Sequence, residues 1–242
     1  MRIPRIRLAG PLSEGNAYRI EDDQARYLRK VLRLDDGHPL VVFDGAGSEF
    51  EAQLERNETG ESEVRLGEAT GSNPESAFRV TLIQGICRGQ RMDYALQKSV
   101  ELGVGEVIAV FCERSVVRLD GRRLDKRLRH WRGVVEAACA QSGRTRLPAV
   151  QAAENLPQAI KGSDTKGIYL DPGAGTSLSG ISPAPNTVRL VVGPEGGLSE
   201  SERSLLQDAG FTGIRLGPRV LRTETAGTAA LTAMQCLWGD LA

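Results

Sequence analysis

The chain has 242 residues, of which 26% are charged and 5% aromatic, so it is long enough for one large or two smaller globular domains. Two histidines, and four cysteines without a CxxC pair, argue against a zinc site and against a histidine-dependent hydrolase. No segment approaches the roughly 20 apolar residues that cross a bilayer, and the N-terminus MRIPRIRLAG lacks a signal-peptide core. We therefore expect a cytoplasmic protein with no metal and no membrane partner.

The charges are unevenly distributed, although the formal net charge is zero. Lys and Arg outnumber Asp and Glu by 14 to 7 in residues 78–150, whereas they are outnumbered by 14 to 10 in residues 1–72. A basic middle between acidic flanks indicates a local surface that binds phosphate groups, as on a nucleic acid.

Short strand patterns and turn signals fill residues 1–72. We expect an edge strand over Arg2–Leu8, marked by Pro4, and a helix over Asp23–Leu34. The apolar stripe of this helix consists of Ala25, Leu28, Val31 and Leu32. Three further strands are expected at residues 39–44, 48–55 and 62–69. Together these elements predict a small β-barrel-like domain.

From Phe78 onward, strand patterns alternate with helix patterns, which predicts an α/β domain with a mainly parallel sheet. Strands are expected at residues 78–86, 107–112, 167–172 and 187–194, and helices at residues 92–104, 124–142 and 154–160. The polar stretch TGSNPESA, residues 70–77, reads as a linker, so we place two domains at residues 1–72 and 73–242. Ligands of such sheets bind at the carboxyl ends of strands.

The stretch from Val191 to Leu231 contains two glycine loops that each follow a strand pattern. Between the loops, Ser199 and Glu202 form the sequence of a capping box, and Gly210 marks the end of the helix. After the second loop, Thr223 is expected to cap a last helix of small residues. Neither loop matches a phosphate-binding motif, and glycine backbone open to a ligand suits an adenosine better.

The paired segments GPEGGLSESE and LGPRVLRTETA closely resemble the SPOUT superfamily of methyltransferases, and within it the ribosomal RNA small subunit methyltransferase E family. The resemblance implies an α/β trefoil-knot methyltransferase domain preceded by a PUA-like RNA-binding β-barrel domain. It also implies an S-adenosylmethionine-dependent homodimer that methylates the ring imide nitrogen, N3, of a uridine. The implied acceptor is small-subunit (16S) ribosomal RNA, naked or within the assembled 30S subunit.

Carried onto this sequence, the resemblance implies a cofactor pocket at the strand ends. The cofactor-binding candidates are Leu170, Gly193, Pro194, Glu195, Gly196, Gly197, Leu216, Gly217, Pro218, Val220, Leu221 and Thr225. Arg222 and Glu224 are the catalytic candidates, the first to stabilise a uridine anion and the second to accept its proton. The alternative for Glu224 is a carboxylate that only stabilises a helix start, and Glu195 equally contacts substrate or caps its loop.

Basic residues of both domains are candidates for contact with RNA. They are Arg2, Arg5, Arg7, Arg26, Arg29, Lys30, Arg33, Arg91, Arg114 and Arg144. The alternative for the basic residues before the linker is a solvated surface without RNA contact. For a separate arginine cluster in residues 122–132, we favour the solvated surface over RNA contact. Ala140 departs from the family, because many relatives carry a Glu there.

Three other functions stay open on the sequence. They are another SPOUT-type methyltransferase that acts on tRNA or a ribose 2′-hydroxyl, a non-catalytic RNA-binding assembly factor, and an α/β enzyme that uses another adenosine cofactor such as NAD.

Overall fold

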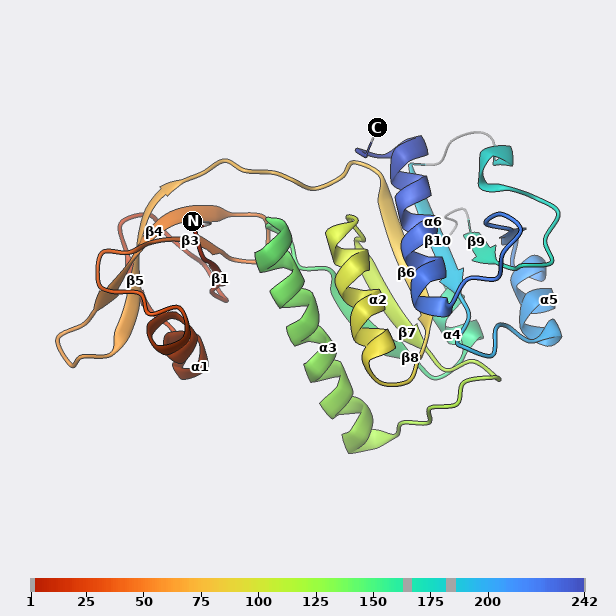
Figure 1. The fold of residues 1–242 in the computed structure, drawn as a ribbon, viewed down its shortest axis with the longest axis horizontal. Coiled ribbons are helices and arrows are strands. Elements are labelled where there is room, and N and C mark those ends of the chain that lie inside the picture. Colours follow the sequence, from red (N-terminus) through yellow and green to blue (C-terminus); the bar gives the residue numbers. More distant parts are fainter. Residues whose placement is uncertain (1–2, 163–166, 182–185, 242) are drawn as a thin grey trace. The chain divides into compact units, whose positions relative to one another are not determined.

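The computed structural model describes residues 3–162, 167–181 and 186–241 (Figure 1). The chain forms two compact units. The first comprises residues 1–75 together with 139–147, and the second comprises residues 76–138 and 148–242.

The first unit is built on a five-stranded sheet with the order β1-β3-β4-β5-β2. Its strands are β1 (Arg5–Arg7), β2 (Ala17–Arg19), β3 (Pro39–Phe43), β4 (Glu49–Arg56) and β5 (Ser62–Ala69). Strand β1 lies at one edge and pairs with β3 in parallel, whereas the other pairs are antiparallel. The alternating side chains of these strands place apolar residues in one core, including Ile6, Val42, Leu54 and Val64.

The predicted helix of this unit is shorter and less regular than its sequence pattern indicates. An α-helix, α1 (Asp22–Arg26), continues into a π-helical turn, η1 (Tyr27–Val31), which changes the direction of the following side chains. Leu28 is buried, but Val31 is 64% and Leu32 36% exposed, so the predicted stripe is wrong at these two positions.

The second unit contains a six-stranded sheet in which all pairs are parallel, with the order β11-β9-β10-β6-β7-β8. Its strands are β6 (Arg79–Gly85), β7 (Glu106–Val110), β8 (Ala149–Ala153), β9 (Gly167–Leu170), β10 (Thr187–Val192) and β11 (Thr212–Ile214). The central strands are almost fully buried, as near-continuous apolar runs require. The sequence pattern missed β8, because AVQAA carries only one β-branched residue.

Helices cover this sheet. They are α2 (Gln90–Glu101), α3 (Gly121–Ser142), α4 (Leu156–Ile160), α5 (Glu200–Asp208) and α6 (Thr223–Trp238), with a 3-10 turn η2 (Leu178–Gly180). Helices α2 and α6 pack side by side, and α6 contacts β6 and β10 (Figure 1). Helix α5 contacts β11 and lies between β10 and β11 in the chain, the two strands whose ends carry the glycine loops. None of the helices in the described ranges is long and apolar enough to span a membrane.

Candidate functional site

A cavity of about 590 Å³ lies at the carboxyl ends of β9, β10 and β11. These strands are neighbours in the sheet, so the loops that leave them converge on one place, as expected for an open parallel sheet. The cavity is lined by residues 170–172, 192–198 and 214–216, by residues 219–224, and by Arg91, Arg114, Arg203 and Ala226. Its size lies within the range of small-molecule sites, about 300–1,000 Å³.

The first loop, residues 193–199, is packed so closely that an added Cβ has no room at Gly193 within the loop or at Gly85 beside it. A Cβ on Gly193 would lie 2.9 Å from the Leu198 nitrogen. A Cβ on Gly85, at the end of β6, would lie 2.5 Å from the Pro194 nitrogen. Gly197 has a φ of 68°, and its N–H donates to the Pro194 carbonyl at 2.8 Å to close the turn. The backbone therefore forms the cavity wall directly.

Helix α5 begins at the end of this loop with the predicted capping box. The Ser199 hydroxyl accepts from the Glu202 N–H at 3.0 Å, and the Glu202 carboxylate accepts from the Ser199 N–H at 2.8 Å. Glu202 also accepts from the Glu113 N–H at 2.9 Å, which connects the loop to the segment after β7. Gly210, at a φ of 79°, follows the helix end as predicted.

Thr223 does not cap α6, because Arg222 occupies the cap position and makes no side-chain capping bond. Instead the Thr223 hydroxyl donates to the Gly193 carbonyl at 2.6 Å and accepts from the Gln84 side-chain amide at 3.0 Å. Thr223 and Gln84 are buried, and Gly193 is partly buried. This small polar network fixes the start of α6 against the ends of β6 and β10.

Two carboxylates face one guanidinium inside the cavity. Arg91 lies 3.3 Å from Glu195 and 3.9 Å from Glu224. Burial raises the pKa of Glu195, but hydrogen bonds from the N–H groups of Arg88 and Glu195 and the charge of Arg91 outweigh it, so the pKa is lowered. The Oε2 atom of each glutamate is buried without a hydrogen-bond partner among the described residues. A ligand with N–H or O–H donors would satisfy both.

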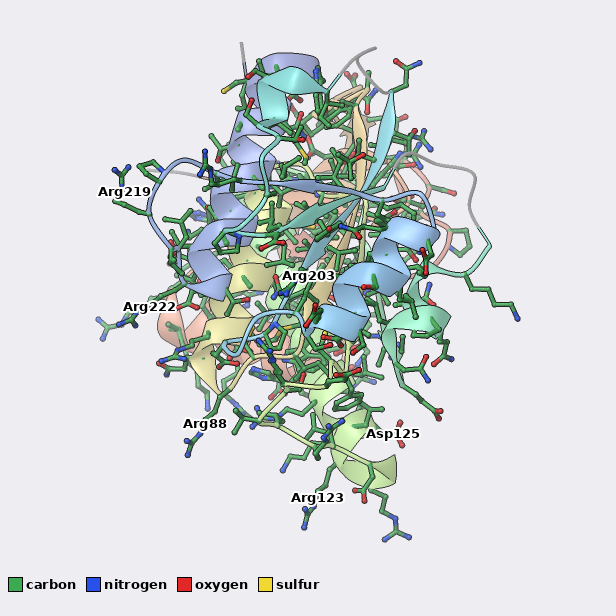
Figure 2. The ribbon with its side chains drawn as sticks, turned by 90° about the vertical axis from the view of Figure 1, so that its right-hand side faces the viewer. Arg88, Arg123, Asp125, Arg203, Arg219 and Arg222 are labelled. Carbon is green, nitrogen blue, oxygen red and sulfur yellow. The ribbon has the colours of Figure 1, made fainter. Side chains whose placement is uncertain are left out.

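A second ion pair joins Arg203 on α5 with Asp171 after β9, at 3.6 Å. Arg203 also donates to the Leu198 carbonyl at 3.0 Å, so its guanidinium is held between two loops of the cavity (Figure 2). Arg114 donates to the Gly196 carbonyl at 3.3 Å. Arg203 was not predicted from the sequence, because its role depends on neighbours distant along the chain.

Most cofactor-binding candidates meet in this cavity. Those that line it are Leu170, Gly193, Pro194, Glu195, Gly196, Gly197, Leu216, Val220 and Leu221, together with the catalytic candidates Arg222 and Glu224. Gly217, Pro218 and Thr225 are not among its lining residues. The buried network residue Gln84 was missed, although a polar side chain within an apolar strand was a usable signal.

The RNA-binding candidates fall into different environments. Arg5 pairs with Glu49 and donates to the Arg144 carbonyl, and Arg144 pairs with Glu75 at 2.5 Å. Arg29 pairs with Asp36 and donates to the carbonyls of Leu34 and Glu55. The side chains of these three arginines are 7–11% exposed, and their ion pairs and hydrogen bonds lie within the first unit.

The other candidates of the first unit are more accessible. Arg26, Lys30 and Arg33 are exposed, and Arg26 lies 3.4 Å from Asp23. Arg7 is partly buried on β1, and Arg2 lies outside the described residues. Arg91 and Arg114 line the cavity of the second unit.

Comparison with known proteins agrees with this architecture. The family described as RNA methyltransferase domain matches residues 74–235, and the RNA methyltransferase PUA domain matches residues 20–66. Ribosomal RNA small subunit methyltransferase E from Buchnera aphidicola subsp. Schizaphis graminum is 32% identical over 99% of this chain and 98% of its own. The Mycobacterium bovis protein of that name is 33% identical over 90% of this chain and 86% of its own.

Two solved structures are similar over their full length. Ribosomal RNA small subunit methyltransferase E from Neisseria gonorrhoeae, bound to S-adenosyl methionine, is 38% identical with a TM-score of 0.91, covering 100% of both chains. A Legionella pneumophila protein in complex with SAM is 33% identical with a TM-score of 0.95, again over 100% of both chains. The predicted fold, a SPOUT-type α/β domain preceded by a PUA-like domain, is confirmed. This chain belongs to the ribosomal RNA small subunit methyltransferase E family.

Proposed function

We propose that the protein is an S-adenosylmethionine-dependent methyltransferase that methylates N3 of a uridine in small-subunit ribosomal RNA. The observation that carries this proposal is the cavity at the ends of β9, β10 and β11, where backbone walls, apolar side chains and two unsatisfied carboxylate oxygens meet. The family relation supplies the reaction and the substrate class. We also propose that residues 1–72 form the PUA-like RNA-binding domain and residues 73–242 the methyltransferase domain.

The residues present fit the cofactor. Leu170, Leu216 and Leu221 provide apolar surface for an adenosine, while the loop backbone provides N–H and C=O groups for its polar edges. The buried Oε2 atom of Glu195 needs a donor, and the ammonium and ribose hydroxyls of S-adenosylmethionine are donors. When bound, this cofactor supplies a methyl group on a positively charged sulfur.

Glu224 is the proposed base. Its side chain is 14% exposed, and its Oε2 atom is free to accept the N3 proton of a uridine. Arg91 balances the charge of the Glu224 carboxylate before proton transfer, and Glu224 becomes neutral when it takes the proton. The nitrogen lone pair would then form the bond to the methyl group as the bond from that methyl group to sulfur breaks, which leaves a neutral thioether. Glu224 also lies in the first turn of α6, where the helix dipole favours a carboxylate. The two roles considered from the sequence, proton acceptor and stabiliser of the helix start, are therefore compatible.

Arg222 keeps its proposed role as the group that stabilises the uridine anion. It lines the cavity at the start of α6, and no ion pair holds it among the described residues. Its guanidinium is therefore available to a substrate, unlike that of Arg91, which already faces two carboxylates.

The alternative functions differ in substrate or in chemistry. The names of the relatives favour small-subunit ribosomal RNA over tRNA, and the unsatisfied carboxylate favours an enzyme over a non-catalytic assembly factor. Because its proposed substrate is ribosomal RNA, we place the protein in the cytoplasm. We also propose a homodimer that acts on either naked RNA or the 30S subunit, which light scattering and assays on both substrates would test.

The test is methyl transfer from labelled S-adenosylmethionine to small-subunit ribosomal RNA, both naked and within the 30S subunit, with mass spectrometry of the nucleosides. Wild-type protein should form 3-methyluridine, and Glu224→Gln should lower kcat by roughly 10²–10⁴-fold, the usual contribution of a general base. Glu200→Gln, on the exposed first turn of α5, is the matched control and should retain wild-type kcat. Absence of methylation by wild-type protein would refute the function, whereas full activity of Glu224→Gln would refute only the base.

A further inference from the structure

The arginines around the cavity divide into two groups according to their partners. Arg91, Arg114 and Arg203 each contact a carboxylate or a loop carbonyl. The second group consists of Arg88, Arg215 and Arg219, which are exposed and form no side-chain ion pair among the described residues. We call this second group the rim arginines. Arg222, the proposed partner of the uridine anion, is kept apart from both groups.

The rim arginines come from segments that converge on the cavity. Arg215 and Arg219 line it along the loop from β11 to α6. Arg88 follows β6, and its N–H donates to the cavity residue Glu195 at 2.9 Å. The labelled side chains of Arg88 and Arg219 extend outward on the same side of the second unit (Figure 2). Exposed, unpaired guanidinium groups around a cavity create a positive surface at its mouth.

We propose that the rim arginines bind the backbone phosphates on either side of the target nucleotide, and that this nucleotide enters the cavity unpaired and unstacked. The proposal rests on the proposed function, because the target base must reach Glu224. Guanidinium groups are well matched to phosphate oxygens, and phosphate contacts fix the register of a nucleic acid on a protein.

The buried position of Glu224, the proposed general base, explains why the target nucleotide must be unpaired and outside an RNA helix. The Glu224 Oε2 atom is buried, whereas the rim side chains reach solvent. A uridine that is paired in a duplex already donates its N3–H to its partner base, so neither its edge nor its proton is accessible. Enzymes that modify such atoms act on single-stranded substrate or extrude the nucleotide.

The test compares two double variants by RNA binding at several salt concentrations. Arg88→Ala with Arg219→Ala removes two rim charges and keeps the Arg88 backbone N–H that binds Glu195. Arg122→Ala with Arg123→Ala removes two exposed charges from α3, outside the cavity lining, and is the matched control. Binding of small-subunit ribosomal RNA is measured by filter binding, and S-adenosylmethionine binding by calorimetry.

The rim variant should weaken RNA binding and reduce the slope of log K against log salt by roughly 1.4, about 0.7 for each lost phosphate contact on a single strand. The control variant should keep the wild-type slope. Methylation of the same uridine should also disappear when an added complementary strand pairs it. A rim variant with the wild-type slope, or a control with an equal loss, would overturn the phosphate contact.

Methylation of the paired uridine at the unpaired rate would overturn the requirement for an unpaired nucleotide. Failure of the proposed function has a different signature, because wild-type protein would then bind RNA without forming 3-methyluridine.

Discussion

Replacing Gly85 with alanine tests whether the contact between β6 and the first glycine loop shapes the cavity. The new Cβ would lie 2.5 Å from the Pro194 nitrogen and 2.7 Å from its Cδ, whereas ordinary contact begins at 3.4 Å. The loop must therefore retreat by about 0.9 Å, because both opposing atoms belong to backbone or ring. Overpacking of this kind costs about 1–3 kcal/mol, which lowers Tm by roughly 2–12 °C in a protein of this size.

The same displacement should impair catalysis more than folding. A misplacement of about 1 Å can cost roughly 10²-fold in rate, so Gly85→Ala should lower kcat for methyl transfer by about that factor. Gly133→Ala is the control, because its Cβ meets nothing within 4 Å on the exposed side of α3, and it should raise stability by about 0.5–1 kcal/mol. Wild-type kcat and Tm in Gly85→Ala would refute the reasoning.

Further predictions concern the capping box, pH and the thiols. Ser199→Ala should lose the bond to the Glu202 N–H and cost about 1 kcal/mol in thermal unfolding, and an unchanged Tm would contradict this. Because the pKa of Glu195 lies below its ordinary value of 4.5, its contacts stabilise the fold fully above that pH and are lost as the pH falls through the lowered pKa. Tm should therefore decline less in acid for Glu195→Gln than for wild-type protein. Burial raises the pKa of Cys87 to about 12, so a thiol reagent at pH 8 should modify exposed Cys236 first, as peptide mapping would show.

The sequence predicted those elements whose local pattern agrees with their burial. The central strands of the second unit are continuous apolar runs, so their positions follow from the pattern alone. Strand β2 has only three residues and was missed, since so short a run carries no periodicity. The π-helical turn after α1 was also not predicted, because the apolar spacing of this segment fits a regular α-helix.

For the site, the motif glycines were informative because close backbone approach excludes side chains, as at Gly193. Partners distant along the chain were not predictable. Thr223 has a residue type suited to a helix cap, but its hydroxyl is used by Gly193 and Gln84. Local propensity describes what a side chain can do, and the tertiary fold decides which partner it has.

Arg91 shows why arginine content alone does not locate an RNA surface. Its guanidinium faces two carboxylates, so that group of three charges has a net charge of about −1 and attracts phosphate less than the rim does. Arg91→Gln should therefore leave the salt dependence of RNA binding unchanged while lowering kcat, because Glu195 and Glu224 then repel each other without a cation between them. Filter binding and methyl-transfer kinetics on one preparation separate these effects. If Arg91→Gln reduced the slope of log K against log salt as much as the rim variant does, Arg91 would instead contact a phosphate.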